Sequence, residues 1–121
     1  MSHTTLLPTT DAAAITLAGA AEISAAGIVS RTLVQSAELR VVLFSFDQGQ
    51  ELTGHSSKRR ALVQVLSGAC DFFFNGQWTR LEAGALLHMP PDHPHAVRAS
   101  HGPFTMLLTL GAEQAAKISS S

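Results

Sequence analysis

The stretch ALVQVLSGACDFFFNGQWTRLEAGALLHM, residues 61–89, decides the fold class because it alternates short apolar runs with turn residues. The runs cover residues 61–67, 70–74, 77–82 and 85–89, and a glycine lies in each connection. β-Branched and aromatic residues favour strands, whereas glycine and asparagine favour tight turns. This stretch therefore predicts a series of short, consecutive β-strands.

Asn75-Gly76 is the strongest turn signal in the chain. Both residue types tolerate the positive φ angles of a type I′ turn, so residues 72–74 and 78–81 are expected to pair as a hairpin. Successive side chains of a strand point to opposite faces. The four aromatic residues of this hairpin are therefore expected to divide between the core and the outer surface.

Similar runs lie on both sides of this stretch, at residues 28–34, 39–46, 96–99 and 104–110. Many short strands with closely spaced turns are typical of a β-sandwich or a closed β-barrel. A last helical turn at 112–117 is the one expected exception. The sequence thus predicts an all-β fold, and a closed barrel would leave no sheet edge open.

The length of 121 residues is sufficient for one domain, since single domains usually contain roughly 100 to 150 residues. Residues 1–21 have no persistent period and predict a loosely ordered N-terminal arm, in which 12–21 could form a short helix. Residues 22–121 are expected to form the single barrel domain. Only 14% of the residues are charged, against about 25% in an average protein. We therefore expect a homodimer that pairs through its N-terminal strand or its outer sheet face.

Charge and composition exclude several classes of partner. The net charge is −1 and the basic residues are scattered except at residues 58–60, so no basic face exists for nucleic acid. The single cysteine, Cys70, cannot form an intrachain disulfide, and we expect it to be an inert buried thiol in a reducing compartment. No Lys or Arg precedes Arg31, and no apolar run has the roughly 18 residues of a membrane span. The prediction is a cytoplasmic protein with no membrane partner.

Two spacings combine glycines with histidines and carry the functional prediction. In the first, Gly49 is followed after five residues by His55, and the segment ends at Gly68. In the second, Gly84 is followed after five residues by Pro90 and then by His95.

These spacings resemble the two motifs of the small cupins, a superfamily of conical jelly-roll β-barrels. The resemblance covers about residues 39 to 110 and implies a double-stranded β-helix. The chain departs from the first motif at Ser57, where the family has its second histidine, and at Ala61, where it has glutamate. It departs from the second at Asp92, in place of a glycine, and at Ala99, in place of an asparagine. Asp92 is expected to adopt the left-handed conformation of the glycine.

A metal site is one chemistry that these positions support. Alternate residues of an unbroken strand face the same side, which would put Glu51, Thr53, His55 and Ser57 on one inward face. Imidazole and carboxylate groups bind Fe, Mn, Ni or Zn, and a catalytic site generally needs about three protein ligands. His55 and His95 are the first two candidate ligands. The candidates for the third are Glu51, His88, His93, and Gln64 if its amide turns inward.

Two functions remain open at this stage. The first is a metal-dependent enzyme that acts on a small organic molecule as a dioxygenase, isomerase or decarboxylase, with catalytic residues not assigned. The alternative is a non-catalytic module that binds or senses a small ligand in a barrel with a degenerate metal site. In either case the basic residues 58–60 lie at the expected rim, where they could attract an anionic ligand or form a solvated loop.

Overall fold

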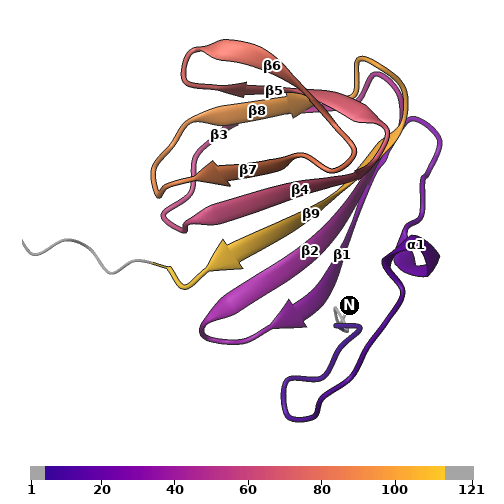
Figure 1. Cartoon of the computed structure of the whole chain (residues 1–121), viewed down its shortest axis with the longest axis vertical. Helices are drawn as coiled ribbons and strands as arrows, with labels where there is room; N and C mark the ends of the chain where they lie inside the picture. The colour runs from indigo at the N-terminus through magenta and orange to yellow at the C-terminus, as the bar shows by residue number, and fades with distance from the viewer. Residues whose placement is uncertain (1–4, 114–121) are drawn as a thin grey trace, which may run out of the picture.

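The structure of the protein is a computed structural model that describes residues 5–113, apart from the side-chain placement at residues 54 and 55. In this range the chain forms one short helix and nine β-strands in two antiparallel sheets (Figure 1). The five-stranded sheet has the order β1 (Ile28–Gln35), β2 (Leu39–Phe46), β9 (Phe104–Gly111), β4 (Ala61–Ser67), β7 (Leu86–Met89). The four-stranded sheet has the order β3 (Glu51–His55), β8 (His95–Arg98), β5 (Ala69–Phe74), β6 (Gln77–Glu82). The prediction of an all-β fold is confirmed, and the helical turn expected at 112–117 lies largely outside the described residues.

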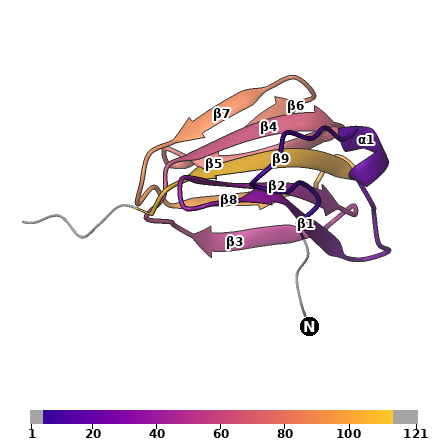
Figure 2. The ribbon, with the colours of Figure 1, turned by 90° about the horizontal axis from the view of Figure 1, so that it is seen from below.

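The two sheets form two layers with the main hydrophobic core between them (Figure 2). Phe46, Phe72 and Phe104 are almost completely buried there, and the rings of Phe46 and Phe104 stack with centroids 4.6 Å apart. In β4 the buried and exposed residues alternate, so that Val63 and Val65 point into the core. This alternation defines the inner face of the barrel, from which any functional group must act.

The hairpin of β5 and β6 has the predicted turn. Asn75 and Gly76 have φ angles of 53° and 80°, and Phe74 pairs with Gln77 across the turn. Phe72 is buried between the sheets, whereas Phe73 contacts the half-exposed Trp78 edge to face, with centroids 5.4 Å apart. The predicted division of the aromatic residues between core and outer surface is confirmed.

The segment 5–27, which includes the described part of the arm predicted at residues 1–21, covers part of the outer face of the five-stranded sheet. Apart from the four-residue helix α1 (Leu17–Ala20) it contains no helix or strand, in line with the predicted loose order. Ala20 packs in a second cluster with Leu33 and Leu43, on the side of the sheet away from the main core. The arm thus contributes a small core of its own to β1 and β2. None of the helices in the described range has the length and apolar character needed to cross a membrane.

Candidate functional site

A cavity of about 140 Å³ lies between the two sheets. Its lining combines eight apolar side chains with one histidine, His95. The lining residues are Phe44, Leu52, Val63, Phe72, Met89, His95, Val97, Met106 and Leu108. Both sheets contribute to this wall, so the cavity is the interior space of the barrel.

A bulge in β3 determines which residues of that strand face the cavity. Leu52 pairs with Val97 and His55 pairs with His95, so three steps along β3 correspond to two steps along β8. One extra residue in β3 resets the alternation of its side chains. As a result Leu52 lines the cavity, while Glu51 and Thr53 are exposed. The prediction that Glu51, Thr53, His55 and Ser57 share one inward face is therefore wrong for Glu51 and Thr53.

The pairing of His55 with His95 brings together the two histidines that the motif spacings singled out. Directly opposite residues of an antiparallel pair have Cβ atoms roughly 4.5 to 5.5 Å apart. The side chain of His55 is outside the described part of the structure. Its backbone position, however, lies opposite a residue that lines the cavity.

His95 is held in a defined orientation. Its Nδ1 donates a hydrogen bond to the carbonyl oxygen of His93 at 3.0 Å, and its ring stacks on Phe72 with centroids 6.0 Å apart. When Nδ1 carries the proton, a neutral imidazole has its lone pair on Nε2. In this form Nε2 is a hydrogen-bond acceptor, and His93 contributes to the site through its backbone carbonyl.

The other candidate ligands lie outside the cavity. Gln64 is exposed in β4, so its amide does not turn inward, as a role as a metal ligand in the barrel would require. His88 is exposed in β7, and its Nε2 lies 2.7 Å from the Arg60 guanidinium. Because arginine has no acceptor, Nε2 of His88 must accept this hydrogen bond. Neither of these residues, nor Glu51, joins His95 at the cavity wall.

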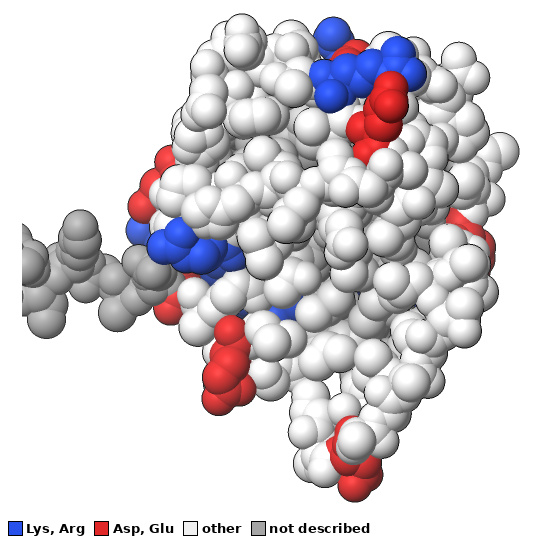
Figure 3. All heavy atoms as spheres, viewed as in Figure 1, with Lys and Arg blue, Asp and Glu red and all other residues white. Residues whose placement is uncertain are grey.

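Two loops meet at the end of the barrel where β8 begins. The Asp92 N–H donates a hydrogen bond to the Ser57 carbonyl oxygen at 2.6 Å, which ties the β7–β8 loop to the β3–β4 loop. Asp92 has a φ of 63°, which confirms the expected left-handed conformation in place of glycine. The β3–β4 loop also contains the basic residues 58–60, which directly follow Ser57. Figure 3 shows Lys and Arg side chains together with Asp and Glu side chains at this end of the molecule, on the left of the view.

The donor groups do not fit a catalytic metal centre with three protein ligands. Of the family's ligand positions, Ala61 has no donor atom, and the Ser57 hydroxyl accepts a hydrogen bond from the Arg59 N–H at 3.0 Å. Among the described residues no group of three or more His, Cys, Asp or Glu is placed to hold a metal ion. His95 with His55 would supply two nitrogens, so no reaction step follows through a metal from this set of residues.

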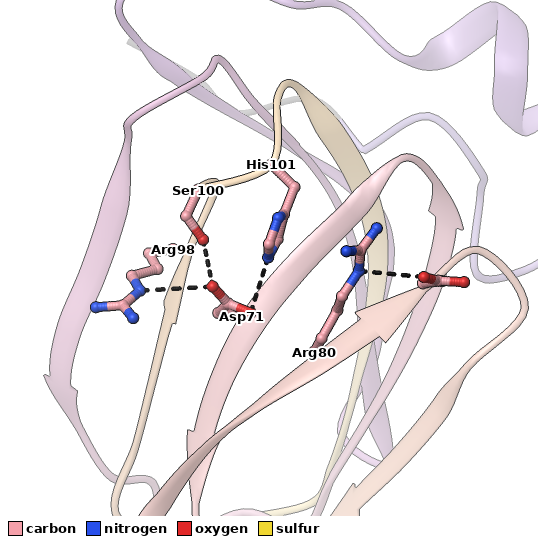
Figure 4. A network of polar contacts seen from close by, with 6 residues as sticks. Asp71, Arg80, Arg98, Ser100 and His101 are labelled. Carbon is pink, nitrogen blue, oxygen red and sulfur yellow. Dashed lines mark hydrogen bonds and ion pairs between the residues drawn. The ribbon is translucent and has the colours of Figure 1, made fainter.

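A polar network lies on the opposite, outer side of the four-stranded sheet (Figure 4). Asp71 accepts hydrogen bonds from the Ser100 hydroxyl and from Nε2 of His101, the latter at 3.0 Å. Nε of Arg98 lies 3.8 Å from the same carboxylate, and the Arg98 guanidinium stacks over the Trp78 ring at 3.9 Å. No spacing in the sequence indicated this network, because its members lie about thirty residues apart and meet only through the pairing of β5 with β8.

Cys70 lies in the core beside this network and is fully buried. Burial, and to a lesser extent the neighbouring Asp71 carboxylate, raises the pKa of the Cys70 thiol to about 12. A thiol with a raised pKa stays protonated at neutral pH, and the expectation that Cys70 is buried is confirmed.

The family is shown by comparison with known proteins. Residues 42–110, more than half of the chain, match the cupin domain family. The chain therefore belongs to the cupin family, and the double-stranded β-helix implied by the two motifs is confirmed. A comparison with curated proteins found no match.

Solved structures agree with this assignment. A conserved protein of unknown function from Streptococcus pyogenes is 33% identical, with a TM-score of 0.77 over 95% of this chain and 98% of that one. A cupin superfamily protein from Desulfitobacterium hafniense is 26% identical, with a TM-score of 0.77 over 88% and 95% of the two chains. A DMSP lyase from Ruegeria pomeroyi, 22% identical with a TM-score of 0.67 over 74% of this chain and 49% of that chain, shows the fold alone.

Proposed function

We propose that this cupin binds a small organic molecule in the cavity between its sheets, with His95 as the main polar contact. The observation that carries the proposal is the cavity itself: eight apolar side chains surround a space of about 140 Å³, and one oriented imidazole lies in its wall. Ligand sites are typically apolar clefts with a few precisely placed polar groups. His55, opposite His95 in the register, is proposed as a second polar contact.

A binding role is favoured over metal-dependent catalysis because of the donor set. Two imidazoles give fewer ligands than the three that a catalytic metal usually has, and Ala61 cannot supply another. A ligand needs only one or two hydrogen-bonding groups for orientation, which His95 and His55 would provide.

The proposal can be tested by a thermal-shift screen of small organic molecules. A molecule that binds only the folded state raises the melting temperature, by an amount that grows with the logarithm of its concentration relative to Kd. We expect stabilising molecules whose effect is lost in His95→Phe, a change that keeps a ring against Phe72 but removes both nitrogens. His88→Phe is the matched control, because His88 is exposed and lies outside the cavity.

Two outcomes would overturn the proposal. One is a screen in which no stabilising molecule depends on His95. The other is metal analysis of protein purified without chelator that finds a full equivalent of a divalent metal, lost in His95→Phe. That result would favour a metal-dependent function instead.

A further inference from the structure

We propose that the protein has a second ligand site, on the outer face of the five-stranded sheet, which takes a neutral aliphatic molecule with one hydroxyl or carbonyl oxygen. A groove of about 460 Å³ lies there, between the segment 5–27 and the end of the sheet where β4 ends and β9 begins. Five aliphatic side chains line this groove together with the hydroxyl groups of Ser67 and Thr105. None of its lining residues belongs to the barrel cavity, so the inference is independent of the proposed function.

Hydroxyl side chains form a row across three strands at this groove. Ser45 of β2 pairs with Thr105 of β9, and Thr105 pairs with Ser67 of β4. In the described part of the chain, Ser45 and Thr105 are the two polar residues that are buried, with exposed fractions of 2% and 6%. Buried polar groups are retained where hydrogen bonds replace those lost to water. The partners of this row therefore decide what the groove can hold.

Two of the three hydroxyl groups keep hydrogen-bonding capacity for a ligand. Ser45 is bonded by the segment above it, because the Glu22 N–H donates to Oγ of Ser45 at 3.4 Å. The hydroxyl oxygens of Ser67 and Thr105 lie 2.6 Å apart, and within the described range neither group makes another hydrogen bond. One bond between two hydroxyl groups uses one O–H donor and leaves the other. The Ser67–Thr105 pair can thus donate one hydrogen bond to an oxygen atom in the groove.

The rest of the lining is aliphatic and determines the body of the ligand. Ile23, on the segment side of the groove, is 48% exposed, and covering it would remove apolar surface from water. None of the described lining side chains is charged, and a charged group buried there without a partner would be unfavourable. The ligand is therefore neutral. The aliphatic lining residues are Leu17, Ala18, Ala21, Ile23 and Leu66.

The volume of the groove sets the size of the ligand. Small-molecule sites usually have volumes of about 300 to 1,000 Å³, and the groove, at about 460 Å³, lies in this range. An engineered apolar cavity of about 150 Å³ binds benzene, with six carbon atoms. A groove about three times as large therefore accepts an aliphatic chain of about eight to twelve carbon atoms.

The test is an NMR titration of the isotope-labelled full chain with four probes at neutral pH: 2-octanone, 1-octanol, octanoate and octylamine. The two neutral probes should cause saturable shifts of the amide signals of Leu66 and Thr105, which lie in the groove. Octanoate and octylamine are charged at this pH and find no partner of opposite charge in the lining. Both should bind at least about tenfold more weakly than the neutral probes.

Variants separate the aliphatic lining from the hydroxyl pair. Ala18→Trp should abolish binding, because Ala18 is exposed and lines the groove, so the larger side chain fills part of it. Ala13→Trp is the matched control, at an exposed residue of the same segment outside the lining. Ser67→Ala/Thr105→Val should weaken binding of 2-octanone roughly three- to tenfold, the effect of one lost hydrogen bond. Thr109→Val, on the same strand but outside the lining, should bind 2-octanone like the wild type.

Binding at the groove can be distinguished from binding in the barrel cavity. Val63 and Val97 line that cavity, and their amide signals should not respond to the neutral probes. If these signals shift instead, and His95→Phe removes the effect, the probes occupy the barrel cavity. That result would overturn this inference and support the proposed function.

Three further results would also overturn the inference. The first is the absence of saturable shifts at Leu66 and Thr105 up to the solubility limit of the neutral probes. The second is undiminished binding of 2-octanone by Ala18→Trp. The third is binding of octanoate as tight as that of 2-octanone, since the site would then not select neutral molecules. Unchanged affinity in Ser67→Ala/Thr105→Val would overturn the assignment of the ligand oxygen to the hydroxyl pair.

Discussion

Asp71 is a single residue whose hydrogen bonds lead to a prediction about pH. The Ser100 hydroxyl, followed by the ring of His101 and the charge of Arg98, lowers the pKa of the Asp71 carboxyl below its ordinary value. A lowered folded-state pKa stabilises the protein above the unfolded-state value, near 3.9, and this contribution disappears as the pH falls through the folded-state pKa. We expect Asp71→Asn to be less stable than wild type by about 1 to 3 kcal/mol at neutral pH. The difference should narrow below about pH 4 in chemical denaturation at a series of pH values.

Glu82→Gln is the control for this residue. Glu82 forms an ion pair with Arg80 at 3.1 Å, but both side chains are more than half exposed. Exposed ion pairs contribute about 0 to 1 kcal/mol, so this variant should follow the wild-type pH profile closely. A pH-independent difference between Asp71→Asn and wild type would contradict the assigned role of the Asp71 carboxylate.

The connection between β4 and β5 is an element whose geometry depends on one glycine. Gly68 has a φ of 74°, and a Cβ atom there would overlap the Pro103 carbonyl oxygen and lie 2.9 Å from Cβ of Phe104. Phe104 is buried at the start of β9, so the neighbouring chain cannot easily move away. We expect Gly68→Ala to lower the free energy of unfolding by more than the roughly 1 to 2 kcal/mol of a left-handed alanine alone, as measured by urea denaturation.

Gly84→Ala provides the comparison, because Gly84 has a φ of 96° but no heavy atom within 4 Å of the Cβ position. It shares the unfavourable backbone conformation and lacks the close contact. The Gly68 variant should therefore be clearly the less stable of the two. Equal losses in the two variants would show that the contact with Pro103 and Phe104 can relax.

Elements could be predicted from the sequence wherever local chemistry determines them. The Asn75-Gly76 turn and its hairpin follow from the φ angles that these residues tolerate, and the structure confirms them. The bulge in β3 was missed, although Gly54 in the middle of a strand is a usual sign of one. The extra residue lies between Leu52 and His55, so an alternation counted back from His55 is reversed before it, and Leu52 rather than Glu51 lies at the cavity.

The candidate site could be predicted only in part, again because some of its features depend on strand register. The motif spacings identified His55 and His95, which pair across β3 and β8. They did not identify the outward positions of Gln64 and His88, since these depend on strand register across the sheet. The Asp71 network was not predicted at all, because its contacts join residues about thirty positions apart.

On the scale of the whole molecule, the outer face of the five-stranded sheet is covered only in part. The arm packs over β1 and β2 through Leu6, Leu17 and Ala20. The N–H groups of Leu6 and Leu7 also donate hydrogen bonds to the carbonyl oxygens of Thr32 and Leu33, so the chain itself occupies part of the free edge of β1. Between the two modes of pairing expected from the sequence, this geometry favours the outer face over the N-terminal strand.

The part of that face over β4 and β7 leaves large apolar side chains in solvent, with Leu62 40% and Leu86 68% exposed. We therefore expect a homodimer that buries this surface, since stable interfaces place apolar residues at their centre. Size-exclusion chromatography with light scattering should give twice the chain mass of 12.8 kDa. Leu86→Lys should give the monomer, because dimerisation would bury an unpaired charge.

Ile15→Lys is the control: this residue is 37% exposed on the arm, and the variant should remain dimeric. If Leu86→Lys remains dimeric, this face is not the interface and pairing through β1 becomes the alternative. If the wild-type protein is monomeric at micromolar concentration, the prediction of a homodimer is wrong.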